Sequence, residues 1–138
     1  MFAMVALAGK AQEPTDTWVK TFCASVAKGE TDKAVDDLFT HIVLGGYPKD
    51  GIENLKGQLA STTKLIGKYH GYRLVAKREL ATALRIEDYM VLFDRQPLRF
   101  RFEFYKPDGE WMLYSFSYDA DLDDDLEQGV KTWDYFDH

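Results

Sequence analysis

Residues 98–118 read LRFRFEFYKPDGEWMLYSFSY, with apolar and polar residues alternating on both sides of Pro107-Asp108-Gly109. A period of two is typical of β-strands, because successive side chains point to opposite faces of a sheet. Proline presets φ for the first turn position and glycine accepts positive φ, so these residues predict a type I turn with a bulge. The stretch therefore predicts a β-hairpin made of Leu98–Tyr105 and Glu110–Tyr118.

The three-residue loop also predicts which residues of the hairpin face one another. It sets Lys106 opposite Glu110, and every other pair follows from that one. On one face the pairs are Phe104/Met112, Phe102/Tyr114, Phe100/Phe116 and Leu98/Tyr118. On the other face they are Tyr105/Trp111, Glu103/Leu113, Arg101/Ser115 and Arg99/Ser117. Burial of a large apolar side chain is worth roughly 1.5–3 kcal/mol, so we expect helices to cover the aromatic face.

Two further strands and three helices are predicted upstream of the hairpin. The alternating runs Tyr72–Leu80 and Leu84–Phe93 complete a four-stranded antiparallel meander. Before them, apolar residues recur with helical spacing in three segments that begin near Thr15, Thr31 and Gly51. Thr15 and Thr31 are the expected N-caps of the first two helices. The predicted fold class is α+β, with three N-terminal helices packed on a curved sheet.

The tail after Tyr118 is acidic and then aromatic. It predicts a short helix from about Asp121, followed by Trp133, Tyr135 and Phe136. Alternate aspartates at 119–125 invite a calcium-loop interpretation, but the sixth position is Asp124 where glycine is needed. Carboxylates suit the start of a helix, which is the simpler interpretation.

The composition argues against nucleic acid as a partner, and the sequence motifs argue against a cofactor or a metal. The chain has 138 residues, enough for one core, and a net charge of -6 that would repel a nucleic-acid backbone. The one cysteine, Cys23, lies on a predicted apolar helix face, so we expect it to be a small buried hydrophobe. No motif for a nucleotide cofactor or metal occurs in the sequence, and we expect no cofactor, no metal site and no membrane span.

The first 14 residues, MFAMVALAGKAQEP, combine a short apolar run with small residues and a polar end. This pattern is typical of the tail of a secretory signal, and the alternative is a disordered terminus. We expect an exported protein, periplasmic or secreted, and otherwise a cytoplasmic one. Residues 15–138 are expected to form a single domain.

Three stretches carry a resemblance to a known family. They are GKYHGYRLV at Gly67–Val75, DYMVLFDRQ at 88–96, and PLRFRFEFYKPDGEWMLYSFSYDADLDDDLE at Pro97–Glu127. From about Trp18 to Glu127 the chain resembles small, uncharacterised bacterial exported members of the nuclear transport factor 2-like superfamily, the cystatin-like α+β roll. The resemblance implies a cone-shaped domain, often a homodimer through its sheet, with room for a cavity between sheet and helices. Family members include isomerases, cyclases and dehydratases as well as plain binding domains, so the fold does not decide the function.

Asp37 and His41 are the candidates for catalysis. They lie four residues apart on the second predicted helix, so an aspartate could orient the imidazole as a general base. An ordinary surface pair near a helix end is the alternative.

Two further sets of residues are candidates for binding. Six aromatic residues could line an apolar ligand cavity, or simply fill the core: Tyr89, Phe100, Phe102, Tyr114, Phe116 and Tyr118. Five residues of the opposite face are candidates for a dimer interface: Arg99, Arg101, Glu103, Trp111 and Leu113.

Three functions remain open on this sequence. The first is a non-catalytic binding or accessory domain, expected to be a homodimer, with a small apolar ligand. The second is a cofactor-independent isomerase, dehydratase or cyclase that uses Asp37, His41 and a tyrosine. The third is a structural protein-interaction domain, which predicts a filled interior.

Overall fold

The computed structural model describes residues 13–43 and 45–132. Three helices come first: α2 (Pro14–Ala27), α3 (Thr31–Phe39) and α4 (Lys49–Ile66). Four strands follow, β1 (Tyr69–Leu80), β2 (Leu84–Phe93), β3 (Leu98–Tyr105) and β4 (Met112–Asp119), and then α5 (Leu122–Thr132). The strands pair in chain order, each antiparallel to the next. The α+β class and the meander are therefore as predicted.

The predictions for the two ends of the chain concern residues that the structure does not describe. The leader-like residues 1–12 and the aromatic residues Trp133, Tyr135 and Phe136 lie outside the described residues. In the described part, no helix combines the length and the apolar character that crossing a bilayer requires.

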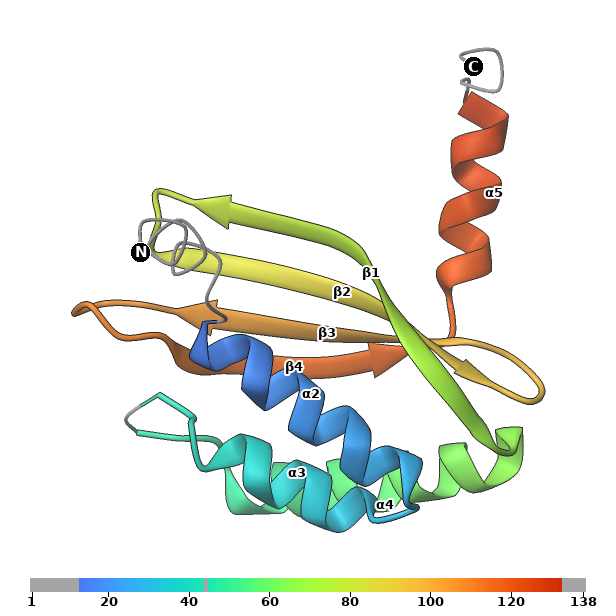
Figure 1. Cartoon of the computed structure of the whole chain (residues 1–138), viewed down its shortest axis with the longest axis horizontal. Helices are drawn as coiled ribbons and strands as arrows, with labels where there is room; N and C mark the ends of the chain where they lie inside the picture. Colours follow the sequence, from blue (N-terminus) through green and yellow to red (C-terminus); the bar gives the residue numbers. More distant parts are fainter. Residues whose placement is uncertain (1–12, 44, 133–138) are drawn as a thin grey trace, which may run out of the picture.

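The three N-terminal helices lie on one side of a strongly curved sheet (Figure 1). Figure 1 shows α2 crossing beneath the sheet, α3 and α4 beyond it, and α5 projecting from the end of β4. The buried apolar residues come from α2, α3, α4 and the concave sheet face, and Phe22, Ala34, Leu59 and Phe100 are among them. The core thus occupies the interior of the roll, where the aromatic strand face was expected to be covered.

The predicted N-caps were wrong. Helix α2 begins with Pro14 at its first position, after the N-cap Glu13, and α3 follows the N-cap Glu30. Proline suits this position because the missing N–H would be unpaired there. Thr15 is fully buried and its hydroxyl accepts a hydrogen bond from Arg85. The threonine thus serves the contact between helix and sheet.

The predicted hairpin exists, but its register was wrong. The structure pairs Phe100 with Tyr118, Phe102 with Phe116 and Glu103 with Ser115, and the register shifts between Glu103 and Phe104. Beyond the shift Phe104 faces Leu113 and Tyr105 faces Met112. Compared with the predicted pairing, the partners in β4 are displaced by two residues over most of the hairpin and by one residue near the turn. A shift of two residues keeps each side chain on its face, whereas a shift of one exchanges the faces.

A contact from α3 explains the position of this β-bulge. The chain after α3 forms a parallel bridge between Ile42 and Leu113. Leu113 N–H donates to the carbonyl of His41 at 2.7 Å, and Val43 N–H donates to the carbonyl of Leu113 at 2.9 Å. Leu113 is fully buried, whereas Tyr114 is 50% exposed. The bulge therefore buries Leu113 and leaves the Tyr114 hydroxyl in water. Its position depends on the contact with Ile42, which is distant in the sequence.

The junction of α4 and β1 depends on Gly67 and Asp94. Gly67 adopts φ +98°, and a Cβ there would lie 2.7 Å from the Asp94 side chain. Asp94 accepts hydrogen bonds from the Lys68 N–H at 2.8 Å and from His70 Nε2 at 2.6 Å. The carboxylate thus ties the β2–β3 turn to the start of β1 only because position 67 has no side chain.

We predict that Gly67→Ala lowers the free energy of unfolding by about 1–3 kcal/mol, because it combines a left-handed backbone with a close contact. Urea denaturation measures the change. The matched control is Gly57→Ala within α4, where a Cβ meets nothing within 4 Å, and there the exchange should stabilise the helix by roughly 0.5–1 kcal/mol. Equal effects at the two positions would contradict this account of the junction.

Candidate functional site

A guanidinium is buried on the concave face of the sheet. Arg85, in β2, is 1% exposed. Its Nη1 donates to Glu13 at 2.8 Å and to Glu79 at 3.4 Å, and its Nη2 donates to Thr15. Its Cζ lies 4.3 Å from the ring centre of Trp111, which gives the cation an aromatic face. Arg85 therefore joins the start of α2 to β1, β2 and the start of the last hairpin strand.

Glu87 lies beside Arg85 on the same face and is also 1% exposed. Its Oε1 accepts a hydrogen bond from the Tyr89 hydroxyl at 2.7 Å. Its Oε2 lies 2.8 Å from Arg85 Nε, but among the described residues neither atom has a correctly oriented hydrogen-bond partner. Burial raises the pKa of Tyr89, and the hydrogen bond to Glu87 adds to that rise. We interpret Glu13, Thr15, Glu79, Arg85 and Glu87, the Arg85 cluster, as structural because its central charges are enclosed.

Packed rings occupy the place where an apolar ligand was expected. Phe100 and Phe102 are fully buried and Phe116 is 3% exposed. The ring centres of Phe102 and Phe116 are 5.1 Å apart, and Phe22 of α2 lies 4.8 Å from Phe116. These distances are typical of aromatic packing. An interior ligand would have to displace these rings.

The three predicted cavity tyrosines do not share one environment. Tyr89 is buried beside Glu87. Tyr118 is half-buried at the rim, where its hydroxyl lies 3.1 Å from Thr62 Oγ1 of α4. Tyr114 is exposed on the outer face next to Tyr105. The structure therefore does not bring the three phenols together.

Asp37 and His41 border a small groove between α2 and α3, with a volume of about 290 Å³. Asp37 Oδ2 accepts a hydrogen bond from Lys33 Nζ at 2.7 Å. The His41 ring stacks on Trp18, with ring centres 4.0 Å apart and planes 11° from parallel. Burial lowers the pKa of His41, and the nearby Asp37 charge only partly opposes this. The carboxylate is thus engaged by a lysine while the imidazole packs on an indole, which is not the arrangement of an oriented general base.

The predicted dimer face is divided by the bulge. Arg99, Arg101 and Glu103 do lie on the outer face of the sheet, as their alternation indicated. Leu113 is fully buried instead, and Trp111 packs under Arg85 against the core. These two residues belong to the interior, because the register shift moved them to the other face.

The outer-face arginines are paired within the chain. Arg101 binds both oxygens of Asp88, at 2.7 and 2.8 Å. Arg99 binds Asp119 at 3.0 Å and also Asp125 of α5. Bidentate pairing of this kind satisfies the guanidinium geometry. These cations are therefore already neutralised.

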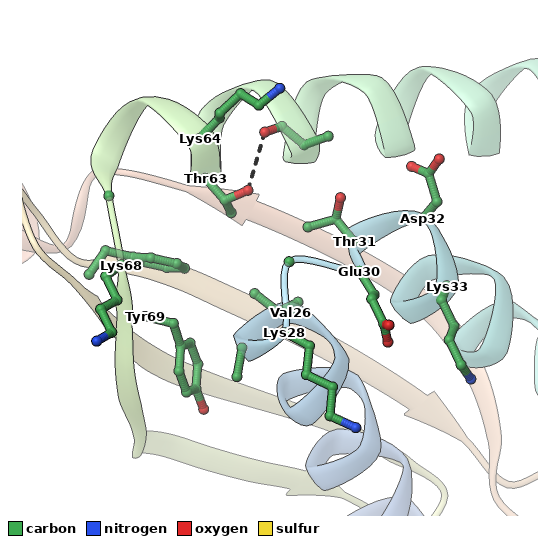
Figure 2. A pocket seen from close by; sticks show the side chains of 15 residues that line it. Val26, Lys28, Glu30, Thr31, Asp32, Lys33, Thr63, Lys64, Lys68 and Tyr69 are labelled. Atoms are coloured by element: carbon green, nitrogen blue, oxygen red, sulfur yellow. Dashed lines mark hydrogen bonds between the residues drawn. The ribbon is translucent and has the colours of Figure 1, made fainter.

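A larger groove opens at the end of the roll where α2 ends, α3 begins and α4 passes into β1. Its volume is about 830 Å³, within the usual range of roughly 300–1,000 Å³ for ligand pockets. Figure 2 shows Lys64 and Lys68 on its α4–β1 side and Lys28 and Lys33 on its α2–α3 side. We call this the lysine groove, after these four residues.

The groove combines an apolar floor with a charged rim. Val26, Tyr69 and Phe93 supply apolar surface, and the rings of Tyr69 and Phe93 meet edge to face at 5.9 Å. Burial raises the pKa of Tyr69 to about 12, so its hydroxyl stays protonated at neutral pH. The lining carries four lysines against only two carboxylates, Glu30 and Asp32.

The sequence patterns predicted neither the Arg85 cluster nor the lysine groove. A signal for the cluster is present, because Arg85 and Glu87 stand two apart inside an otherwise apolar strand. The groove gives no such signal, since its lysines come from separate elements that only the tertiary fold brings together.

Two solved structures are similar to this chain. No family model and no curated protein matches the chain. A Campylobacter jejuni protein, provisionally named an NTF2-like transpeptidase, is 15% identical with a TM-score of 0.57, and the match covers 75% of this chain and 99% of that one. A Thiobacillus denitrificans protein, provisionally named a calcium/calmodulin-dependent protein kinase type II association domain, is 14% identical with a TM-score of 0.45, covering 77% and 93%. Identities this low bear on the fold alone.

We predict that Arg85→Met lowers the free energy of unfolding by about 3–5 kcal/mol, because it removes the nearest cation from the buried Glu87 carboxylate and leaves only Lys77 Nζ, 4.0 Å away. The double variant Arg85→Met/Glu87→Leu should recover most of this loss, since Glu13 and Glu79 are partly exposed and water can solvate them. Thermal and urea denaturation compare the variants. A double variant no more stable than the single one would contradict the assignment of Glu87 as the main unpaired charge.

We predict that His41 titrates below its ordinary value of about 6.5, because burial against Trp18 disfavours the imidazolium. The unfolded chain then binds the proton first, so stability falls as the pH drops below that ordinary value and stops falling below the folded pKa. NMR titration of the imidazole measures the pKa, and His41→Phe should remove this part of the pH dependence. A pKa above the ordinary value would instead indicate an ion pair with Asp37.

Proposed function

The chain has the nuclear transport factor 2-like fold, and from this premise we propose that it is a non-catalytic binding domain. Its binding surface is the lysine groove, and its partner presents negative charge beside an apolar group. The proposal keeps the binding function expected from the sequence but moves the site from the interior of the roll to its end.

The observation that carries this proposal is the contrast between the interior and the groove. The interior aromatic rings are packed and fully buried, so binding there would cost the contacts between them. The groove is already open, with about 830 Å³ beside the partly buried Tyr69 and the buried Val26 and Phe93. A preformed concave site needs less rearrangement on binding.

Electrostatics favour an anionic partner. Within the described residues, the ammonium groups of Lys28, Lys64 and Lys68 form no ion pair, whereas Lys33 is held by Asp37. The chain as a whole carries a net charge of -6, so this excess of lysines is a local positive region on an acidic protein. Ammonium groups bind carboxylates and phosphates through charge-assisted hydrogen bonds.

The enzyme alternative finds less support. It requires Asp37 and His41 to act together, and these residues are engaged by Lys33 and Trp18 respectively. The homodimer through the sheet remains a proposal as well, but the outer-face arginines that would attract a partner are paired internally.

Dodecanoate tests the proposed function, because it joins a carboxylate to an apolar chain. We expect calorimetry at low salt, below the micelle concentration, to show saturable binding that weakens as salt is added. The variant Lys28→Glu/Lys68→Glu should weaken binding by about tenfold or more. The control Lys20→Glu/Lys49→Glu changes two exposed lysines outside the groove by the same charge and should bind nearly as well as the parent. Equal losses in both variants would mean that dodecanoate responds only to net charge.

A further inference from the structure

Helix α5 carries an apolar stripe that the other described residues leave largely exposed. Leu122, Leu126 and Val130 are spaced four residues apart, so their side chains share one face. Leu126 is 71% exposed and Val130 is 45% exposed. Figure 1 shows α5 standing away from the sheet and the other helices. An isolated helix of 11 residues is marginal in water, so contacts with a partner would stabilise it.

The same helix is strongly acidic at its start. Asp123, Asp124 and Asp125 occupy its first turn and Glu127 follows. It therefore presents carboxylates next to leucine and valine, which is the chemistry that the lysine groove favours. Amphipathic helices commonly bind by laying their apolar face in a groove.

We propose that the lysine groove of one copy of the chain receives the α5 helix of a second copy. The inference rests on the proposed function, since it names the occupant of that groove. The stripe of α5 would cover the apolar floor formed by Val26, Tyr69 and Phe93, and the first-turn carboxylates would face Lys28, Lys64 and Lys68.

The position of the two surfaces favours a reciprocal pair. In Figure 1, α5 rises from the same end of the molecule at which α4 passes into β1. Two copies that meet at this end can each place a helix in the groove of the other. Such a two-fold exchange closes the assembly as a dimer, whereas a one-way contact would continue into a chain of copies.

The connection of α5 to its own sheet opposes docking within one chain. Only Ala120 and Asp121 separate β4 from α5, and Asp121 N–H donates to Asp119 at 2.9 Å. Arg99 holds Asp125 at the end of the sheet. These contacts keep α5 directed away from α3 and α4, so the groove is left for another copy.

Sedimentation equilibrium of the full chain tests the inference. We expect a dimer at low salt that dissociates as salt is added. Leu126→Ser should make it monomeric, as should Lys28→Glu/Lys68→Glu and Asp123→Lys/Asp124→Lys. Combining the two charge reversals in one chain should restore the dimer, because the complementarity is re-formed with exchanged signs. The controls Lys20→Glu/Lys49→Glu and Leu80→Ser alter exposed residues outside both surfaces and should remain dimeric.

Two results would overturn the inference. One is a parent protein that stays monomeric in this experiment. The other is a dimer that tolerates the groove and α5 variants but dissociates with Tyr114→Glu on the outer sheet face. Dodecanoate binding distinguishes failure of this inference from failure of the proposed function. If dodecanoate binds the groove of a protein that does not dimerise through α5, the proposed binding function stands and only this inference fails. If dodecanoate does not bind, both fail.

Discussion

The buried guanidinium of Arg85 is the constraint on which the roll depends. Glu13 and Thr15, at the start of α2, and Glu79 of β1 accept its hydrogen bonds. The ring of Trp111 packs against the guanidinium. Removing a guanidinium from water is costly, so its partners must all be in place for the folded state to form. This requirement fixes how α2 crosses the sheet, and α2 in turn sets where α3 and α4 pack.

The position of α2 explains why the interior is closed and the end of the roll is open. With α2 held against the sheet, Phe22 enters between Phe100, Phe102 and Phe116 and fills the concave face. The helix then ends at Ala27, before it reaches the junction of α4 and β1. The space beyond its last turn becomes the lysine groove. The binding surface is therefore a consequence of helix length and packing.

The sequence predicted the fold class, the order of elements and the aromatic concave face, because these depend on local periodicity and on the turn at 107–109. The sequence-based predictions were wrong where contacts with a distant segment determine the strand register or the burial of a residue. The register of the hairpin depends on the bridge between Ile42 and Leu113, and that bridge moved Trp111 and Leu113 from the outer face to the interior. The burial of Thr15 depends likewise on Arg85, 70 residues away. The lysine groove is assembled from three helices and two strands, so no spacing along the chain could indicate it.

The central claim is that the chain binds at the end of the roll and that the interior stays closed. Amide chemical-shift mapping with dodecanoate tests this most directly, because every backbone N–H reports its own surroundings. The account predicts that the changes gather at residues 26–33 and 63–69, with Phe100, Phe102 and Phe104 unaffected. Changes centred on those three phenylalanines, with the groove unaffected, would show that the interior opens and would contradict the account.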